Sequence, residues 1–136
     1  MDKRFEDHGL LSWAELLTSD FEGSFAFYSE LFGWSLQEVP GRGESRYALI
    51  LNENSSEPFA GILAMPKPLS DRSVPCHWQT YITVENVETT VEKAQALGAV
   101  VVLGPMEIER VGTIAAIRDP QGAVISVIKY SQKTRS

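Results

Sequence analysis

The sequence has little of three features that mark particular classes of protein. Its single cysteine, Cys76, excludes a disulfide within the chain, so we expect a reducing compartment, the cytoplasm. It has 12 Lys and Arg against 18 Asp and Glu, a net charge of −6, which argues against nucleic acid because a phosphate-binding face needs clustered cations. No apolar run is long enough to span a bilayer, and the first residues carry no apolar signal-peptide core. We therefore expect a soluble protein with no nucleic-acid or membrane partner.

What the sequence does contain is an internal repeat. Apolar residues recur twice at helical spacing, and each stripe follows a capping residue and precedes a glycine. The first stripe is Phe21, Phe25, Tyr28 and Phe32, closed by Gly33, and the second is Val87, Val91, Ala94 and Leu97, closed by Gly98. Ser19 followed by Glu22 is typical of a capping box, with Asp20 as the competing N-cap. The repeat predicts two helices in two similar halves, with each stripe facing a core.

Alternating segments give both halves the order strand, helix and three strands. The expected strands are 10–18, 35–39, 46–51 and 59–65 in the first half, and 76–84, 100–103, 113–118 and 123–129 in the second. One helix covers only one face of each sheet, so neither half is expected to be stable alone. We predict a single domain, residues 1–136, made of module 9–66 and module 75–130 joined by a Pro-rich linker. Residues 1–8 are charged and unpatterned, which predicts a loose arm.

Five short motifs resemble the glyoxalase/bleomycin-resistance/extradiol-dioxygenase superfamily, also called vicinal oxygen chelate proteins, and its glyoxalase-like subgroup. They are Trp13-x-Glu15-Leu16-x-Thr18-x-Asp20, Phe27-Tyr28, Phe32-Gly33-Trp34, His77-Trp78-x-x-Tyr81 and Asp119-Pro-Gln-Gly122. The resemblance covers about residues 9–130. It implies an α+β fold in which two βαβββ modules form a cup-shaped mixed sheet, and a homodimer, since many relatives pair modules across a twofold axis. The superfamily includes isomerases, dioxygenases, transferases and non-catalytic antibiotic binders, so membership does not name an activity.

The resemblance also implies four positions where metal-dependent relatives place their ligands. These positions are Trp13, a residue near Gly61, Gln79 and Ser126. Tryptophan does not ligate a metal, glycine has no side chain, and serine is a poor ligand for transition metals. Only Gln79 remains suitable, so we predict no metal and no other cofactor.

The family positions, extended by strand parity, imply which side chains would line the cup. They are Trp13, Glu15, His77, Gln79, Tyr81 and Ser126. Apolar walls with a few polar groups suit a small organic ligand. An indole at position 13 offers a flat surface for an aromatic or cationic compound, and Glu15 adds negative charge on the same face. In the alternative interpretation Trp13 plugs the cup and leaves no ligand site.

A second hypothesis from another class is an enzyme. Glu15, His77 and Gln79 could hold a displaced metal, as in a metal-dependent glyoxalase-like lyase or a dioxygenase, or Glu15 could act as a general base. Glu15 could equally be a buried carboxylate that bonds to a neighbouring strand. Cys76 and His77 are adjacent in a strand and point to opposite faces, which excludes a nucleophile–base pair. Binding is favoured over catalysis because the metal positions are lost.

Overall fold

The structure is a computed structural model that describes residues 3–42, 45–67, 71, 73–108 and 111–131. The chain divides into two compact units, and each is described by itself. One unit is Trp13–Gln79, and the other combines Met1–Ser12 with Thr80–Ser136. Residues 68–70 and 72 of the expected linker, and residues 132–136 at the end, lie outside the described residues. Among the described residues, no helix has the length and apolar character needed to cross a membrane.

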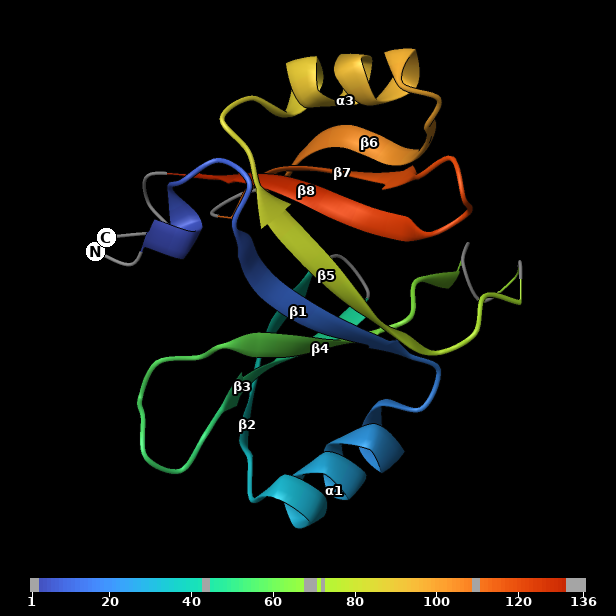
Figure 1. The fold of residues 1–136 in the computed structure, drawn as a ribbon. Helices are drawn as coiled ribbons and strands as arrows, with labels where there is room; N and C mark the ends of the chain where they lie inside the picture. The colour runs from blue at the N-terminus through green and yellow to red at the C-terminus, as the bar shows by residue number, and fades with distance from the viewer. Residues whose placement is uncertain (1–2, 43–44, 68–70, 72, 109–110, 132–136) are drawn as a thin grey trace. The chain divides into compact units, whose positions relative to one another are not determined.

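The unit Trp13–Gln79 contains helix α1 and a sheet with strand order β2-β3-β4-β1 (Figure 1). Its elements are β1 (Leu11–Thr18), α1 (Phe21–Phe32), β2 (Ser35–Arg42), β3 (Ser45–Leu51), β4 (Ala60–Ala64) and the start of β5 (His77–Thr83). β1 and β4 are parallel, while β3 is antiparallel to both β2 and β4. Helix α1 packs against β4 and β2.

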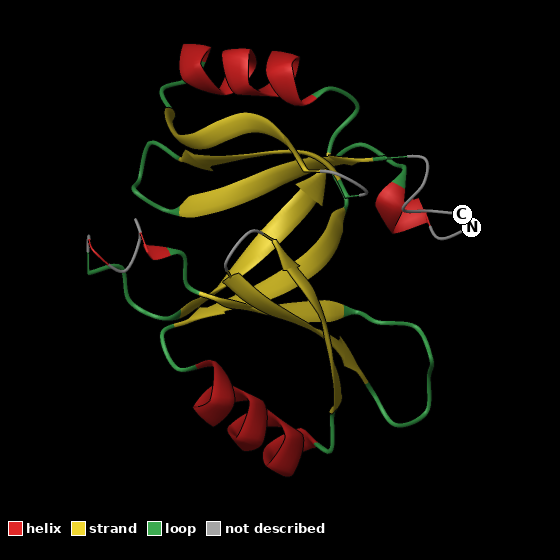
Figure 2. Cartoon of the chain, turned by 180° about the vertical axis from the view of Figure 1, so that it is seen from behind, coloured by secondary structure: helices red, strands yellow, loops and turns green. Residues whose placement is uncertain are grey.

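The second unit repeats this arrangement with strand order β5-β8-β7-β6. Its elements are the short helix η1 (Lys3–Phe5), the end of β5, α3 (Val87–Ala96), β6 (Val100–Ile108), β7 (Gly112–Arg118) and β8 (Val124–Tyr130). β5 is parallel to β8, and β7 is antiparallel to β6 and β8. Both units therefore have the order strand, helix and three strands, with helices and strands segregated as Figure 2 shows. The predicted α+β class and the βαβββ repeat are confirmed.

The helix starts follow from local capping. The Asp20 carboxylate accepts a hydrogen bond from the Gly23 N–H at 2.9 Å, and the Asn86 side chain accepts one from the Thr89 N–H at 2.9 Å. These contacts satisfy backbone donors that have no partner in the first turn of a helix. Asp20 is thus the N-cap of α1, and the predicted capping box on Ser19 is wrong.

Each unit has its own hydrophobic core between its helix and one face of its sheet. The core of Trp13–Gln79 is Leu16, Phe21, Ala48, Ile50, Ala60 and Ile62. The core of the second unit is Val84, Val87, Val91, Ala115 and Val127. Because side chains alternate along a strand, the neighbours of these residues lie on the face that the helix leaves uncovered. That face carries Trp13 and Glu15 in the first unit.

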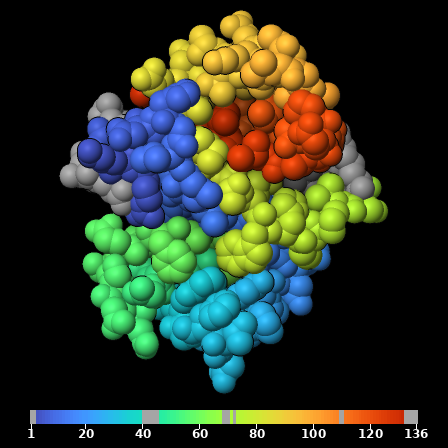
Figure 3. Space-filling view, viewed as in Figure 1, coloured from blue at the N-terminus to red at the C-terminus, as the bar shows by residue number. Residues whose placement is uncertain are grey.

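The aromatic stripe of α1 is less buried than its spacing predicts. Phe21 is buried, but Phe32 is 55% exposed. Two other apolar residues of the helix are also exposed, Phe27 at 57% and Leu31 at 55%. The atoms of α1, in light blue, lie on the surface in Figure 3. Phe32 instead contacts Trp34, with ring centroids 4.8 Å apart, at the end of the helix.

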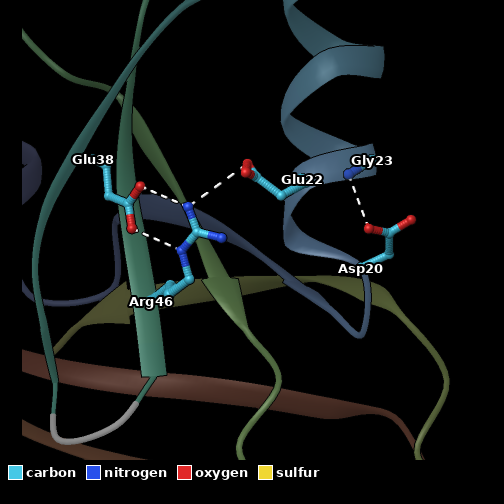
Figure 4. Close-up of polar contacts among 5 residues, drawn as sticks. All are labelled: Asp20, Glu22, Gly23, Glu38 and Arg46. Atoms are coloured by element: carbon cyan, nitrogen blue, oxygen red, sulfur yellow. Dashed lines mark hydrogen bonds and ion pairs between the residues drawn. The ribbon is translucent and has the colours of Figure 1, made fainter.

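An exposed arginine ties α1 to the hairpin of β2 and β3 (Figure 4). The Arg46 guanidinium donates two hydrogen bonds of 2.8 Å to the Glu38 carboxylate and lies 3.6 Å from the Glu22 carboxylate. Its carbon lies 4.4 Å from the ring centroid of Phe21. The hydrogen bond from Arg46 lowers the pKa of Glu38. Since all three charged groups are open to solvent, this network orients side chains more than it stabilises the fold.

The prediction of a loose arm at residues 1–8 is wrong for the part that the structure describes. The Phe5 ring meets the Tyr130 ring edge-on, with centroids 5.0 Å apart. The Thr83 hydroxyl donates to the Arg4 carbonyl, and the Gly9 N–H donates to the Thr83 carbonyl at 2.7 Å. An aromatic contact and backbone partners hold this segment, although its sequence has no hydrophobic period.

Candidate functional site

The six candidate residues divide between the two units. Trp13, Glu15, His77 and Gln79 belong to the unit Trp13–Gln79, whereas Tyr81 and Ser126 belong to the other. β1 and β5 carry five of the six, and β8 carries Ser126.

Trp13 makes a hydrogen bond that the sequence did not predict. Its indole Nε1–H donates to the hydroxyl of Tyr47, on β3, at 3.3 Å. Trp13 is half-buried, while Tyr47 is 3% exposed. The indole is therefore held at its polar edge, and part of its surface remains accessible.

Gly61 explains how Tyr47 reaches Trp13. A Cβ atom at position 61 would lie 2.6 Å from Cζ of Tyr47 and closer still to its hydroxyl oxygen. Non-bonded carbon atoms do not approach so closely, so the Tyr47 ring occupies the space that any side chain at position 61 would need. A residue with no side chain is required here, and it can supply no metal ligand.

A sequence signal for Tyr47 did exist. Glycine in the interior of a strand often marks the close approach of another group. Gly61 lies within β4, whose antiparallel register with β3 places Tyr47 opposite Leu63, two residues from Gly61 and on the same face. The sequence thus indicates a close approach at Gly61, whereas the register of β3 on β4 identifies Tyr47 as the residue that makes it.

Glu15 is the register partner of Gly61 in the parallel pair of β1 and β4. Glu15 is 2% exposed and interacts with another group of the protein. A carboxylate so far from water requires a partner for its charge or a proton. This burial fits the hydrogen-bonded carboxylate, and Glu15 stays a prediction as a ligand-binding group.

His77 and Gln79 form a pair on β5. The His77 Nδ1 atom lies 2.8 Å from the Pro75 carbonyl oxygen, and Nε2 lies 3.1 Å from Oε1 of Gln79. A carbonyl oxygen only accepts, so Nδ1 carries the hydrogen. Nε2 donates to Oε1 of Gln79 when the ring carries a second proton, and is an acceptor when the ring is neutral. The backbone thus fixes the His77 tautomer and leaves Nε2 directed at Gln79.

The thiol of Cys76 lies just before this pair and has its own donors. The Ser19 N–H donates to Sγ at 3.3 Å, and the Ser19 hydroxyl lies 3.4 Å from the same sulfur. The Ser19 side chain, and then its backbone N–H, lower the pKa of the Cys76 thiol because they stabilise the thiolate. Cys76 is exposed.

In the other unit, Tyr81 and Ser126 are register partners in the parallel pair of β5 and β8. Tyr81 is 7% exposed and Ser126 2%. A further pair of hydroxyls in this unit is also buried, with Ser12 Oγ 2.7 Å from Tyr130 Oη. At these four positions the unit offers neutral hydroxyl groups.

The side chains at the four family positions make a poor set of metal ligands. Position 61 is empty and covered by Tyr47, and position 13 is an indole that donates its only N–H. Gln79 and Ser126 offer neutral oxygen atoms, whereas transition metals prefer nitrogen, sulfur or carboxylate ligands. Within the described part of the chain, no three His, Cys, Asp or Glu side chains gather where they could hold an ion.

Known proteins with similar sequences are longer than this chain. The putative glyoxylase CFP32 of Mycobacterium tuberculosis is 35% identical over 121 residues, which are 89% of this chain and 44% of the relative. The anthracycline biosynthesis protein DnrV of Streptomyces peucetius is 23% identical over 127 residues, which are 88% of this chain and 46% of that protein. The chain thus spans less than half the length of these relatives.

Solved structures share the fold at low identity. Methylmalonyl-CoA epimerase from Mycobacterium tuberculosis aligns with a TM-score of 0.61 and 20% identity, covering 93% of this chain and 91% of the epimerase. An extradiol ring-cleaving dioxygenase from B. fuscum aligns with a TM-score of 0.61 and 14% identity, covering 93% of this chain and 34% of the dioxygenase. At such identities the likeness concerns the fold alone.

The family model described as Glyoxalase/Bleomycin resistance protein/Dioxygenase superfamily matches residues 10–127. This match includes both βαβββ units and agrees with the family indicated by the five motifs. The chain belongs to the glyoxalase/bleomycin resistance protein/dioxygenase superfamily.

Proposed function

We propose that this protein binds a small planar organic ligand, aromatic or cationic, without a metal or other cofactor, and that the ligand stacks on Trp13. The observation that carries the proposal is the hydrogen bond from Trp13 Nε1 to the Tyr47 hydroxyl at 3.3 Å, above a Gly61 that has no room for a side chain. Of two positions where relatives would place metal ligands, one is the held indole of Trp13 and the other is Gly61, covered by Tyr47.

The accessible part of Trp13 supports stacking rather than plugging. A plug would be buried like Tyr47, whereas Trp13 is half-buried. A cation over the face of an indole gains about 1 kcal/mol, and more where water is excluded. Glu15 lies two residues along the same face, and we assign it a contact with the ligand in addition to its partner within the protein. We assign the wider ligand set to the six candidate residues, in a single domain of residues 1–136 with modules 9–66 and 75–130.

The name of one relative points to the same class of ligand. DnrV is named an anthracycline biosynthesis protein, so its name concerns a small organic compound. At 23% identity the name supports a small organic ligand and no particular compound.

The second candidate is a metal-dependent glyoxalase-like or dioxygenase-like enzyme with a displaced site. The relative at 35% identity is named a putative glyoxylase. In addition, the Pro75 carbonyl fixes His77 with Nε2 as the acceptor, which is how many metal-binding histidines are oriented. Glu15, His77 and Gln79 would be its ligands.

Titration with N-methylquinolinium, a planar cation, and with quinoline, its neutral counterpart, tests the first candidate. We expect each compound to quench tryptophan fluorescence in a saturable way, and the cation to bind with the higher affinity. Trp13→Leu should abolish this quenching. Glu15→Gln should remove the preference for the cation. If Trp13 were a plug, Trp13→Ala would cost about 3 kcal/mol or more of the free energy of unfolding, and neither compound would bind.

Elemental analysis of protein purified without chelator separates the two candidates. The binding protein should contain no stoichiometric transition metal. Close to one metal per chain, lost in Glu15→Ala or His77→Ala, would favour the enzyme.

We also propose a homodimer that acts in the cytoplasm, where Cys76 stays reduced, with a small molecule rather than nucleic acid as its partner. Sedimentation at micromolar concentration should give twice the mass of the chain, and a monomer alone would refute the dimer.

A further inference from the structure

Tyr47 contacts Trp13, on which the proposed ligand stacks, and lies over Gly61, the register partner of Glu15. Its hydroxyl accepts from the Trp13 indole, and its ring lies over Gly61, with Cζ and Cε1 only 2.6 and 3.0 Å from where a Cβ would be. Gly61 is the register partner of Glu15, so the Tyr47 ring stands beside the strand position of Glu15. One side chain thus contacts Trp13 and covers the strand position next to Glu15.

The position of Tyr47 is fixed by packing as well as by hydrogen bonding. The residue is 3% exposed, so its ring has little free volume in which to move. β3 holds its backbone in register with β4 on one side and β2 on the other. A ring held in this way restricts both the rotation of the indole and the space next to it.

We propose that Tyr47 is the specificity-determining residue of the ligand site: it orients the Trp13 indole and closes the space over Gly61 to ligand rings. The effect on ligand choice rests on the proposed function. The contacts of Tyr47 with Trp13 and Gly61 are properties of the protein without ligand. The hydroxyl holds the indole plane, and the ring leaves a ligand only the accessible face of Trp13. A shorter residue at position 47 would open a space shaped like a phenol ring.

The indole N–H signals of the three tryptophans in an NMR spectrum test the orienting role. Tyr47→Phe removes the acceptor, so the Trp13 indole proton should shift upfield and exchange faster with heavy water. A matched control exists, because the Trp78 indole donates to the Tyr28 hydroxyl at 3.2 Å. Tyr28→Phe should move the Trp78 signal and leave Trp13 in place. An unmoved Trp13 signal in Tyr47→Phe would overturn the orienting role.

The steric role is tested by pairing changes at positions 47 and 61. Gly61→Ala should lower the melting temperature of the wild type, because its methyl group meets the Tyr47 ring. In a Tyr47→Ala background the same change should cost little, since the ring is gone. Equal losses in both backgrounds would overturn the steric role. Tyr47→Leu, which keeps a larger apolar side chain, replaces Tyr47→Ala if the latter does not fold.

Small molecules test the effect on specificity. Phenol, which has the shape of the ring that Tyr47→Ala removes, should raise the melting temperature of this variant and leave the wild type unchanged. Benzene lacks a hydroxyl that could accept from Trp13 and should raise it less. Equal effects of phenol on wild type and variant would contradict a closed space over Gly61.

The two proposals fail in different ways. If Tyr47→Phe moves the Trp13 signal but neither N-methylquinolinium nor quinoline binds the wild type, the proposed function is wrong and Tyr47 still orients Trp13. If N-methylquinolinium binds wild type and Tyr47→Phe with equal affinity, and the Trp13 signal does not move, the role of Tyr47 is wrong and the proposed function stands.

Discussion

At the scale of single residues, hydrogen bonds set the reactivity of Cys76. The Ser19 side chain, followed by its backbone N–H, lowers the pKa of the thiol, and the residue is exposed. Only the thiolate is nucleophilic, so a lowered pKa increases the reactive fraction at neutral pH. We predict that alkylation by iodoacetamide has its pH midpoint below the ordinary value of about 8.5. Ser19→Ala should move the midpoint upward.

Ser19→Thr is the control for this prediction, because it keeps a hydroxyl beside the sulfur and should keep the low midpoint. The sign follows from the charge on the sulfur, since donors stabilise the thiolate and not the thiol. Identical midpoints in wild type and Ser19→Ala would show that the hydroxyl has no influence.

Residue identity alone could not reveal the contacts around Trp13. The alternation of β1 gives the face of Trp13 and Glu15, but the partner of the indole lies on β3, 34 positions away. Only the register of β3 on β4 brings Tyr47 over Gly61. That the six candidate residues form a ligand site stays a prediction. Tyr47 joins them only because the folded structure places it against Trp13 and Gly61.

At the scale of elements, the capping residues should carry measurable stability. Asp20 accepts from the Gly23 N–H at 2.9 Å, at the positive end of the helix dipole. Loss of such a cap costs about 1 kcal/mol, so Asp20→Ala should lower the free energy of unfolding by that amount in urea titrations. Asp20→Asn keeps the acceptor and should cost only a fraction of this. Equal losses in the two variants would mean that the cap does not act through its hydrogen bond.

The boundaries of elements show where sequence patterns lose information. The sequence predicts a strand at 100–103 with a break at Gly104-Pro105, whereas β6 continues through both residues to Ile108. It does so with register shifts between Val101 and Leu103 and between Leu103 and Met106. A bulge absorbs residues that cannot join the ladder, so a Gly-Pro pair interrupts pairing without ending the strand. The exposure of Phe32 was unpredictable for a related reason. Helical spacing predicts which side chains share one face of α1, but not how much of that face the sheet covers.

At the scale of the whole molecule, the repeat was readable because each module is built from local signals. A cap, an apolar stripe, a closing glycine and three alternating segments occur twice in order, and both units have that order. The family match over residues 10–127 agrees with it. The chemistry of a ligand site does not follow from such local signals. The candidate side chains come from different strands, and the role of each depends on the residues that contact it in the folded chain.

The last prediction concerns the cooperativity of the two units. Each sheet has a face that its own helix does not cover, so we propose that neither unit is stable alone and that the chain unfolds in one step. All three tryptophans, Trp13, Trp34 and Trp78, belong to the unit Trp13–Gln79, whereas Val127 is a core residue of the other. Tryptophan fluorescence therefore reports on one unit, and far-UV circular dichroism reports on both.

Val127→Ala should shift the urea midpoint seen by tryptophan fluorescence, although no tryptophan belongs to its unit. The expected loss in the free energy of unfolding is about 2 kcal/mol, the cost of the buried methyl groups and the cavity they leave. Ile62→Ala, in the core of Trp13–Gln79, is the matched change and should shift both probes together. If Val127→Ala moves the dichroism transition and leaves the fluorescence transition in place, the units unfold independently, and the proposal of a single domain is wrong.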